Sequence, residues 1–559
     1  MKKIILATLL VSLTVSMMAF ELKPLSGDRN DVFYYRSVPS DIYGRFMAVV
    51  PVFVVYPDGR MSLEQAQDYM HDTGLDELVR MSDGAVYIIN PLAETYDAVK
   101  DLAYYNEFIA GQFLVTNLKI LGFGKGADFV NGTLSRQAGN VAGIVSVGGK
   151  ASISGNVLRE SPVPVYVAGN NAGRTALSYI SLNDAVKVSE TSSYLSIYEN
   201  EDEKLLRVVV DERKDVGVGE YLRTAWDELL SRNYRYNNYC HTWYTGDSDM
   251  RYGDYELVPY VDYDRMKLVR NVVLKSNDAG KDFLWYEYLP EELSQLPECS
   301  VPMVVLLHGN GNDPRTQAET SGFLSVAEKE RIVVVEMEWQ GSEEYGALGM
   351  DGVETAVYDI LRKYPQIDRS RIYAEGLSAG AIMATATGVR KSYIFAAVGA
   401  QSGGVMNHRA FAPSRESLEN EALQKRGKVI MPYFSIMCLD DEVVHRVTEE
   451  NHADNSFFNA WKLYGKMNGA TVAEMPDFSI DPVFGISLND RREIRNMKNV
   501  DVHVGDVNVD GRPVLRLVAV EEYGHWNFQP ATWMMWDYFK LWSRDPLTGE
   551  SIYHGQKIR

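Results

Sequence analysis

The chain has 559 residues, which is too long for one ordinary hydrophobic core, so two or more domains are expected. Hydrophobic residues make up 46% of the sequence and charged residues 24%, as in a soluble globular protein. The formal net charge of −20 argues against a nucleic-acid partner, because a phosphate-binding surface normally carries net positive charge.

The N-terminus has the order of a secretory signal sequence. Lys2 and Lys3 precede an apolar stretch from Ile4 to Met18, and Ala19 follows it. The stretch is short for a transmembrane anchor, which needs ~20 apolar residues. No cysteine follows it to carry a lipid. We therefore expect residues 1–19 to be a signal peptide and the mature protein to be periplasmic or secreted, without a membrane span.

Residues 20–235 contain apolar runs that are typical of buried strands. They lie at Phe33–Pro39, Val50–Val55 and Ala85–Ile89, and a glycine-rich segment follows at Leu121–Gly126. A stretch rich in Tyr, Asn, Asp and Gly comes next. We interpret residues 236–254 as a linker between two domains.

Residues 255–559 alternate apolar runs with helical patterns. Runs with no polar alternation indicate a mainly parallel sheet that is covered on both faces, so this half is predicted to be α/β. The runs are Val301–Leu307, Arg331–Val335, Arg371–Ala374, Ile394–Val398 and Val429–Phe434.

The two halves repeat one plan. Val50-Pro51 enters a strand as Val301-Pro302 does, and Leu121–Gly126 matches Glu375–Gly380 at a nearly equal interval. Any two α/β domains share strand-rich stretches, but anchors in the same order favour a duplication. The prediction is two tandem α/β domains with doubly wound, mostly parallel sheets.

The chain has three cysteines, Cys240, Cys299 and Cys438. An oxidising compartment would permit one disulfide, and Cys240–Cys299 is the preferred pair. Their spacing does not indicate a metal site.

Ser378 is the candidate nucleophile. It lies in Gly376-Leu377-Ser378-Ala379-Gly380, between a predicted strand and the predicted helix Ala381–Thr387. Nucleophilic acyl transfer needs a serine on a tight strand-to-helix turn with small residues on both sides, and G-x-S-x-G supplies them. The alternative is a purely structural turn.

A serine needs a histidine to take its proton and an acid to orient the histidine. In this kind of fold the acid and then the histidine follow the serine along the chain. His525 is best placed, because it follows the apolar run Val514–Val520 and precedes the helical run Ala531–Trp542. His503 is expected to be an exposed strand residue. The other histidines after Ser378 lie in loop-like or tail sequence: His408, His445, His452 and His554.

The acid is expected in the loop after the run Val429–Phe434. Asp440 is preferred because its spacing to Val443 fits an Asp-x-x-Val turn, with the valine packed beneath the loop. Asp441 is the alternative.

The oxyanion needs main-chain N–H donors. Ala379 supplies one, and Gly309 or Asn310, in the loop after the run Val301–Leu307, supplies the other. His308, at the start of that loop, is expected to pack beneath it.

These motifs resemble the polyhydroxybutyrate-depolymerase and feruloyl/acetylxylan-esterase branch of the α/β hydrolases, from about Phe283 to Asp545. The resemblance rests on the strand before His308-Gly309, on Gly376–Gly380 and on Gly524-His525-Trp526. It implies a triad of Ser378, Asp440 and His525, with no metal and no organic cofactor. The acid loop departs from the family, which usually has His-Gly before the aspartate. The segments 407–428 and 478–500 are longer than in the family.

The N-terminal half resembles the same fold without its chemistry. Gly124 stands at the nucleophile position, and Gly219-Glu220 stands roughly where Gly-His is expected. The acid region reads Ala168–Ala172. The oxyanion loop reads Tyr56-Pro57-Asp58-Gly59, and proline has no N–H to donate. We expect this half to pack against the catalytic half, to line its cleft or to bind an extended substrate.

The sequence therefore predicts an exported serine ester hydrolase, with acylated polysaccharide or polyester as candidate substrates. One alternative is a serine peptidase of the same fold. Another is a non-catalytic carbohydrate-binding or scaffolding protein. The sequence leaves the oligomeric state open.

Overall fold

The computed structural model describes residues 20–25, 29–37, 49–110, 117–150, 162–237, 255–276, 280–406, 412–498 and 500–557. The predicted signal peptide, Cys240 and most of the predicted linker lie outside these residues. The expectations about them, including the Cys240–Cys299 pair, stay predictions.

The N-terminal half contains a ten-stranded sheet with the strand order β1-β2-β4-β3-β5-β6-β7-β10-β9-β8. The strands are β1 (Lys23–Pro24), β2 (Val32–Arg36), β3 (Val52–Tyr56), β4 (Ala85–Ile89), β5 (Leu118–Phe123), β6 (Val141–Val147), β7 (Val165–Ala168), β8 (Ala185–Ser192), β9 (Leu195–Asn200) and β10 (Arg207–Asp211). The helices are α2 (Leu63–Thr73), α3 (Leu75–Met81), α4 (Lys100–Tyr104), α5 (Lys125–Gly132), α6 (Ala172–Leu182) and α7 (Val218–Ala225).

The C-terminal half contains a second ten-stranded sheet, ordered β13-β14-β16-β15-β17-β18-β19-β22-β21-β20. The strands are β13 (Leu268–Lys275), β14 (Phe283–Pro290), β15 (Val301–Leu307), β16 (Val333–Met337), β17 (Ile367–Leu377), β18 (Ala397–Gln401), β19 (Tyr433–Cys438), β20 (Asp490–Met497), β21 (Val500–Val509) and β22 (Arg512–Val520). The helices are α8 (Tyr263–Met266), α9 (Pro314–Thr320), α10 (Phe323–Glu330), α11 (Gly349–Lys363), α12 (Ala379–Arg390), α13 (Arg415–Lys425), α14 (Ser456–Asn468) and α15 (Gln529–Phe539). A small sheet of β23 (Trp542–Arg544), β24 (Ser551–Tyr553) and β25 (Gln556–Lys557) ends the described chain.

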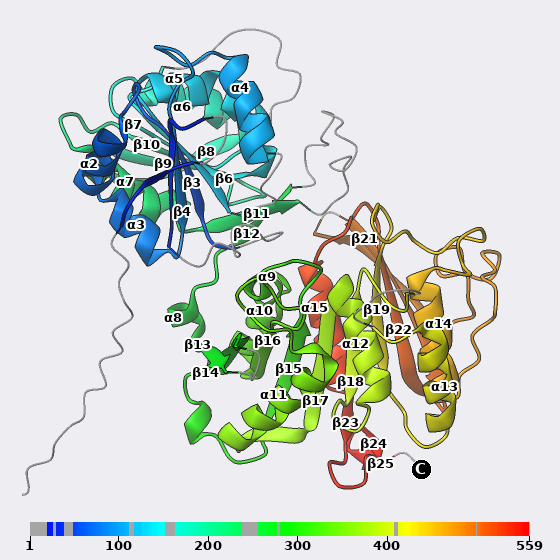
Figure 1. Cartoon of the computed structure of the whole chain (residues 1–559). Coiled ribbons are helices and arrows are strands. Elements are labelled where there is room, and N and C mark those ends of the chain that lie inside the picture. The colour runs from blue at the N-terminus through cyan, green and yellow to red at the C-terminus, as the bar shows by residue number, and fades with distance from the viewer. Residues whose placement is uncertain are drawn as a thin grey trace, which may run out of the picture.

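The two sheets have the same strand order and the same pattern of parallel and antiparallel pairs. In each, the second strand joins the fourth antiparallel, the central strands run parallel, and an antiparallel hairpin closes one edge. The predicted tandem α/β-hydrolase-like fold is confirmed (Figure 1).

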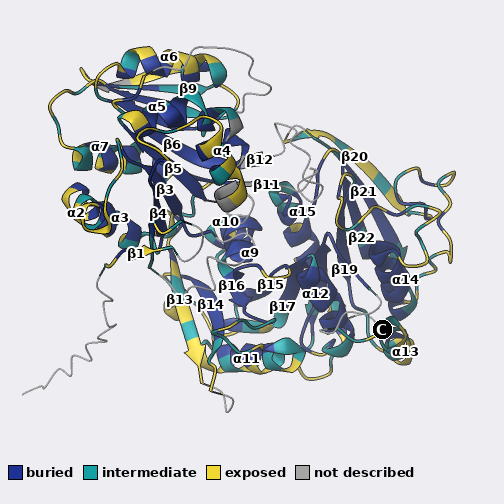
Figure 2. Ribbon diagram, turned by 45° about the horizontal axis from the view of Figure 1, so that its top comes forward, coloured by how far each residue is buried: buried dark blue, intermediate teal, exposed yellow. Residues whose placement is uncertain are grey.

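The strands alternate their side chains between two buried faces, as in a doubly wound sheet. In the N-terminal half, Val52 and Val54 pack on the face covered by α5 and α6, whereas Phe53 and Val55 pack on the face covered by α2, α3 and α7. In the C-terminal half, α12 contacts Val398 on one face of β18 and α15 contacts Gly399 on the other. Figure 2 shows the buried strands between helices whose outer faces are exposed.

Several strands begin later than the apolar runs that predicted them. The run Ile394–Val398 becomes β18 at Ala397–Gln401, and the run Val429–Phe434 becomes β19 at Tyr433–Cys438. Ile394, Phe395 and Ala396 in the first run and Met431 in the second are buried in the chain that enters the sheet, so burial begins before strand pairing does. Polar Gln401 and Cys438 therefore end their strands next to the site described below.

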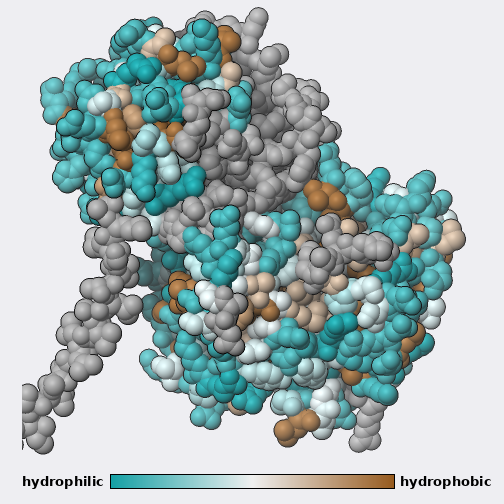
Figure 3. All heavy atoms as spheres, in the orientation of Figure 1, coloured by the Kyte–Doolittle hydropathy of each residue, from teal (hydrophilic) through white to brown (hydrophobic). Residues whose placement is uncertain are grey.

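A two-stranded ribbon lies between the halves. β11 (Asn233–Asn237) pairs antiparallel with β12 (Tyr255–Pro259), so β11 runs across the predicted boundary at residue 235. No helix within the described ranges is long and apolar enough to cross a membrane. The face shown in Figure 3 is mostly hydrophilic, with small and separate apolar patches.

Gly126 lets α5 approach β3 closely, and this contact yields a stability prediction. A Cβ at residue 126 would lie 1.9 Å from the carbonyl oxygen of Tyr56, whereas a Cβ at Gly59 would meet nothing within 4 Å. Gly126→Ala should lower the free energy of unfolding by about 1–3 kcal/mol through overpacking, and Gly59→Ala should change it little. Urea unfolding measures both, and equal stabilities of the two variants would contradict this account.

Candidate active site

Ser378 lies on the turn between β17 and α12. Its backbone has φ 56° and ψ −116°, a region that side-chain-bearing residues rarely occupy and that costs about 1–3 kcal/mol. Its N–H donates to the Gln401 carbonyl at 2.9 Å, which fixes the turn to the end of β18. The serine is half-buried, while Ala379 and Gly380 after it are buried.

The turn depends on glycine at residue 380. A Cβ there would lie 1.8 Å from the carbonyl oxygen of Leu307, so any side chain would push α12 away from the end of β15. Gly376 is equally confined, since its Cβ would lie 2.3 Å from the Gly380 carbonyl. These contacts explain why the sequence needs small residues on both sides of Ser378.

His525 and Asp441 form a buried pair. His525 Nδ1 lies 2.7 Å from Asp441 Oδ2, and the two side chains are 8% and 0% exposed. A carboxylate can only accept, so a neutral His525 carries its proton on Nδ1 and leaves Nε2 as the basic nitrogen. This is the tautomer that a general base for a serine requires.

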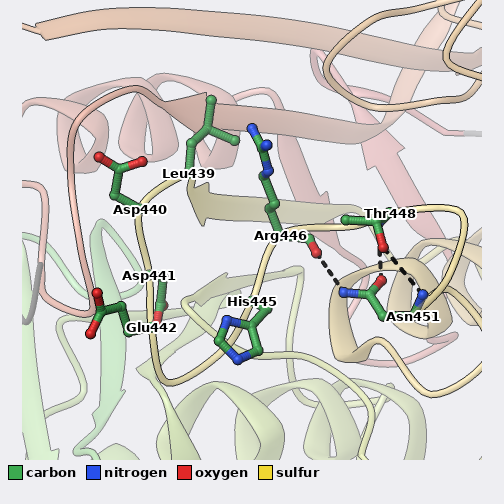
Figure 4. Close-up of a pocket in the computed structure, with 8 residues that line it drawn as sticks. All are labelled: Leu439, Asp440, Asp441, Glu442, His445, Arg446, Thr448 and Asn451. Carbon is green, nitrogen blue, oxygen red and sulfur yellow. Dashed lines mark hydrogen bonds between the residues drawn. The ribbon is translucent and has the colours of Figure 1, made fainter. Parts of the chain in front are cut away.

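The structure places Asp441, the alternative acid, against His525, and not the preferred Asp440. Asp440 is exposed, and its carboxylate points away from that of Asp441 (Figure 4). The expected valine beneath the loop is wrong by one residue as well, because Val443 is 43% exposed and Val444 packs against the core. The Asp-x-x-Val turn therefore runs from Asp441, whose Oδ1 accepts the N–H groups of Val443 and Val444 at 2.8 and 2.7 Å.

The chain near His525 is held by buried polar groups that sequence reasoning did not single out. The Tyr523 hydroxyl donates to the Asn527 carbonyl at 2.9 Å, and Gln401 Nε2 donates to the Trp526 carbonyl. Asn527 Nδ2 donates to Gln317 Oε1 at 3.1 Å. These bonds fix the residues on both sides of His525.

The predicted oxyanion loop lies against the serine turn. A Cβ on Gly309 would lie 3.6 Å from the Leu377 carbonyl, and Gly309 is buried whereas Asn310 is exposed. Ala379 is the first residue of α12, so its N–H has no acceptor within the helix. Gly309 thus lies next to the turn that carries Ala379, and both stay candidate oxyanion donors.

His308 is buried beneath this loop, as expected. Its Nδ1 lies 2.8 Å from the Gly309 carbonyl and its Nε2 lies 3.2 Å from Glu338 Oε1. Trp339 Nε1 donates to the His308 carbonyl at 3.0 Å. His308 therefore fixes the shape of the loop.

His503 is not exposed, contrary to expectation. It is 7% exposed on β21, and its ring nitrogens contact Glu521 at 2.5 Å and Arg491 at 3.0 Å. These polar partners let a strand histidine turn inward. His408 lies outside the described residues.

A hollow of about 500 Å³ opens beside the acid loop (Figure 4). The hydrogen bonds of Asn451 to Thr448 and to the Arg446 carbonyl shape one wall. Its lining residues are Leu439, Asp440, Asp441, Glu442, His445, Arg446, Thr448 and Asn451.

The N-terminal half keeps the same turn without a side chain to react. Gly124 has φ 54° and ψ −117°, and its N–H donates to the Val147 carbonyl at 2.9 Å. The Lys125 N–H, which corresponds to the Ala379 N–H, donates to Asp58 Oδ1 at 2.7 Å. Asp58 stands where the C-terminal half has Gly309, so its carboxylate occupies the corresponding amide site.

The structure corrects the expected position of Gly219-Glu220. These residues lie in the first turn of α7, whereas the segment that corresponds to the His525 loop is 212–217, between β10 and α7. That segment contains no histidine.

Glu375 lies three residues before Ser378 and is buried in β17. Gln317 Nε2 donates to its carboxyl oxygens at 2.9 and 3.2 Å. Burial raises the pKa of the Glu375 carboxyl to about 8. A carboxyl with this pKa is mostly protonated at neutral pH.

Within the described residues, no group of three or more His, Cys, Asp or Glu side chains could hold a metal ion. No family model and no curated protein matches the sequence.

Solved esterase structures are similar to the chain. An acetyl xylan esterase from Aspergillus awamori has 13% identity over 49% of this chain and 99% of its own, with a TM-score of 0.35. An S-formylglutathione hydrolase from Agrobacterium tumefaciens has 12% identity over 49% and 96%, with a TM-score of 0.33. A feruloyl esterase module from Clostridium thermocellum has 12% identity over 49% and 87%, with a TM-score of 0.31.

The Asp441–His525 contact predicts which acid matters for the reactivity of Ser378. Asp441→Asn should lower the rate at which a fluorophosphonate labels the serine by about 10³-fold or more, because the amide favours the wrong histidine tautomer. In Asp440→Asn, the rate at which the fluorophosphonate labels Ser378 should stay within about threefold of the wild-type rate. Intact-protein mass spectrometry gives both rates, and the reverse order would restore Asp440 as the acid.

The raised pKa of Glu375 predicts how stability depends on pH. The folded pKa of about 8 lies above the ordinary 4.5, so the stability that the neutral carboxyl contributes is complete below pH 4.5 and is lost as the pH rises through about 8. Glu375→Gln keeps an oxygen for Gln317 and cannot ionise. Thermal unfolding from about pH 5 to about pH 9 should show the wild type losing stability relative to Glu375→Gln. A constant difference between the two proteins would mean that Glu375 does not titrate in this range.

Proposed function

We propose that this protein is an exported serine hydrolase that cleaves carboxylic esters through Ser378, His525 and Asp441. The observation that carries the proposal is the pairing of a strained serine turn at the end of β17 with a buried His525–Asp441 contact in the loops after β22 and β19. These strands are close in the sheet, because β18 and β19 lie between β17 and β22. The carboxylate contact to His525 Nδ1 and the order Ser378, Asp441, His525 along the chain both agree with a serine triad.

In the proposed reaction the Ser378 hydroxyl oxygen attacks the ester carbonyl carbon, and His525 Nε2 takes the hydroxyl proton. The N–H groups of Ala379 and Gly309 donate to the oxyanion that forms. The carbon–oxygen bond to the alcohol then breaks, and His525 gives its proton to the leaving alcohol. Water, deprotonated by His525, attacks the acyl-serine, and the acid product leaves as Ser378 regains its proton.

The N-terminal half takes no chemical part in this proposal. Gly124 has no hydroxyl group. The Asp58 carboxylate already accepts a hydrogen bond from the Lys125 N–H, the group that would otherwise be available to stabilise an oxyanion. An oxyanion brought next to that carboxylate would be repelled by its charge. This half therefore has a structural or binding role.

The proposed substrates are the acyl esters of polysaccharides and polyesters that the family resemblance implies. Short-acyl aryl esters, methyl ferulate, acetylated xylan and polyhydroxybutyrate form the first panel. A peptide amide panel tests the peptidase alternative, since the same triad can cleave amides.

Replacing the nucleophile tests the proposal directly. Ser378→Ala should lower kcat on the cleaved ester on the order of 10⁶-fold, because the triad works as a unit. Ser479→Ala, at an exposed serine in another loop, should leave kcat unchanged. Activity that survives in Ser378→Ala would overturn the proposal. A wild type that binds polysaccharide, cleaves no ester and is not labelled by a fluorophosphonate would favour the scaffolding alternative.

A further inference from the structure

Helix α9 connects the loops of the candidate active site. It starts directly after the oxyanion loop, and the Asp313 carboxylate caps it by accepting the Arg315 N–H at 3.1 Å. The sequence of α9 is PRTQAET, so polar side chains leave the helix in several directions although nearly all of it is buried. The side-chain hydrogen bonds of this short buried helix therefore help to fix its position.

The inner side of α9 holds the serine strand and the histidine loop. Gln317 donates to Glu375 on β17 and exchanges hydrogen bonds with Asn527, two residues after His525. Thr320 Oγ1 accepts from Asn527 Nδ2 at 3.2 Å. A shift of α9 would therefore move the chain on both sides of the reaction centre.

The outer side of α9 carries Glu319, which is 4% exposed. Its carboxylate accepts from the hydroxyls of Tyr234 at 2.5 Å and Tyr263 at 2.7 Å, and Arg315 Nε donates to it at 3.1 Å. Burial raises the pKa of Glu319, but Arg315, Arg270 and the two hydroxyls together bring it below its ordinary value. Glu319 is therefore a buried anion that depends on its donors.

One of those donors belongs to the ribbon that is anchored in the N-terminal half. Next to Tyr234 on β11, Asn233 Nδ2 donates to the Ala142 carbonyl at 2.9 Å, and Lys119 Nζ on β5 donates to the Asn233 carbonyl at 2.9 Å. Arg235 donates to the Pro162 carbonyl at 2.7 Å. Figure 1 shows β11 and β12 between the N-terminal sheet and α9.

A second contact joins the halves at the same helix. Asp83, which follows α3, lies 3.7 Å from Arg315 and 4.0 Å from Arg270. Both arginines also lie near Glu319. The N-terminal half thus contacts α9 through a hydroxyl and through a carboxylate.

We infer that the N-terminal half positions the active site, and that Tyr234 is the positioning residue through which it holds α9. The inference rests on the proposed esterase function. The oxyanion loop, Gln317 and Glu319 belong to one continuous stretch, so the bond from Tyr234 fixes the helix that the catalytic loops share. Donors to an oxyanion act only when they are held at the right distance, and a small displacement lowers kcat more than it changes KM.

The test removes this one hydroxyl and compares it with a matched hydroxyl elsewhere in the N-terminal half. Tyr166 also donates from a buried tyrosine to a carboxylate, Asp211, at 2.6 Å, but it lies inside the N-terminal sheet. In the full-length protein, Tyr234→Phe should lower kcat about five- to tenfold with KM within about twofold. Tyr166→Phe should leave kcat within about twofold, because its bond does not reach α9.

Amide hydrogen exchange gives a readout that needs no substrate. Tyr234→Phe should speed exchange in segments 308–320 and 521–529, and Tyr166→Phe should not. Equal kcat and unchanged exchange in Tyr234→Phe would overturn the inference, as would equal losses in both variants. If the wild type cleaves no ester, the proposed function fails and the exchange data still decide the positional claim.

A second pair of variants guards against misfolding. If Tyr234→Phe does not fold, Glu319→Gln tests the same bond from the other side, because the amide oxygen can still accept from Tyr234. A folded Glu319→Gln protein should keep more of the wild-type kcat than Glu319→Ala. Equal activity of these two variants would contradict a positioning role.

Discussion

A Cβ at residue 380 would lie only 1.8 Å from the carbonyl oxygen of Leu307, so no side chain fits at this position. This contact brings the start of α12 against the end of β15, and the oxyanion loop begins one residue later. At this contact Ser378 has a strained backbone and a half-buried side chain. The rest of the site is arranged around this point.

Polar groups beneath the site hold it in place. Glu375, Gln317 and Asn527 form a buried chain from the serine strand to the histidine loop, and α9 provides its middle member. A buried polar network of this kind favours one arrangement, since a displaced member leaves unpaired groups in a low dielectric. Its Gln317–Asn527 bond joins residues that are 210 positions apart in the sequence.

Local pattern was sufficient to place Ser378 and His525 after the ends of buried strands, because periodicity reveals those strands. The duplicated fold could be predicted too, since Val-Pro strand entries and glycine turns recur in order. The acid could not be chosen, because Asp440 and Asp441 are adjacent and only the turn after Cys438 decides which one faces inward. Glu319 and Tyr234 gave no local signal, since their contact joins residues of different halves.

Asp58 also restricts how the N-terminal half could change. A serine at residue 124 would place its Cβ 2.0 Å from Asp58 Oδ1, so the Asp58 side chain would have to move aside to admit it. Without Asp58, the Lys125 N–H would lose its acceptor, but residue 124 would still offer no nucleophile. A serine triad would also need a histidine, which segment 212–217 lacks, so these two changes alone would not give this half the chemistry proposed for Ser378. Several coordinated substitutions, and not a single one, therefore separate the N-terminal half from the site of the C-terminal half.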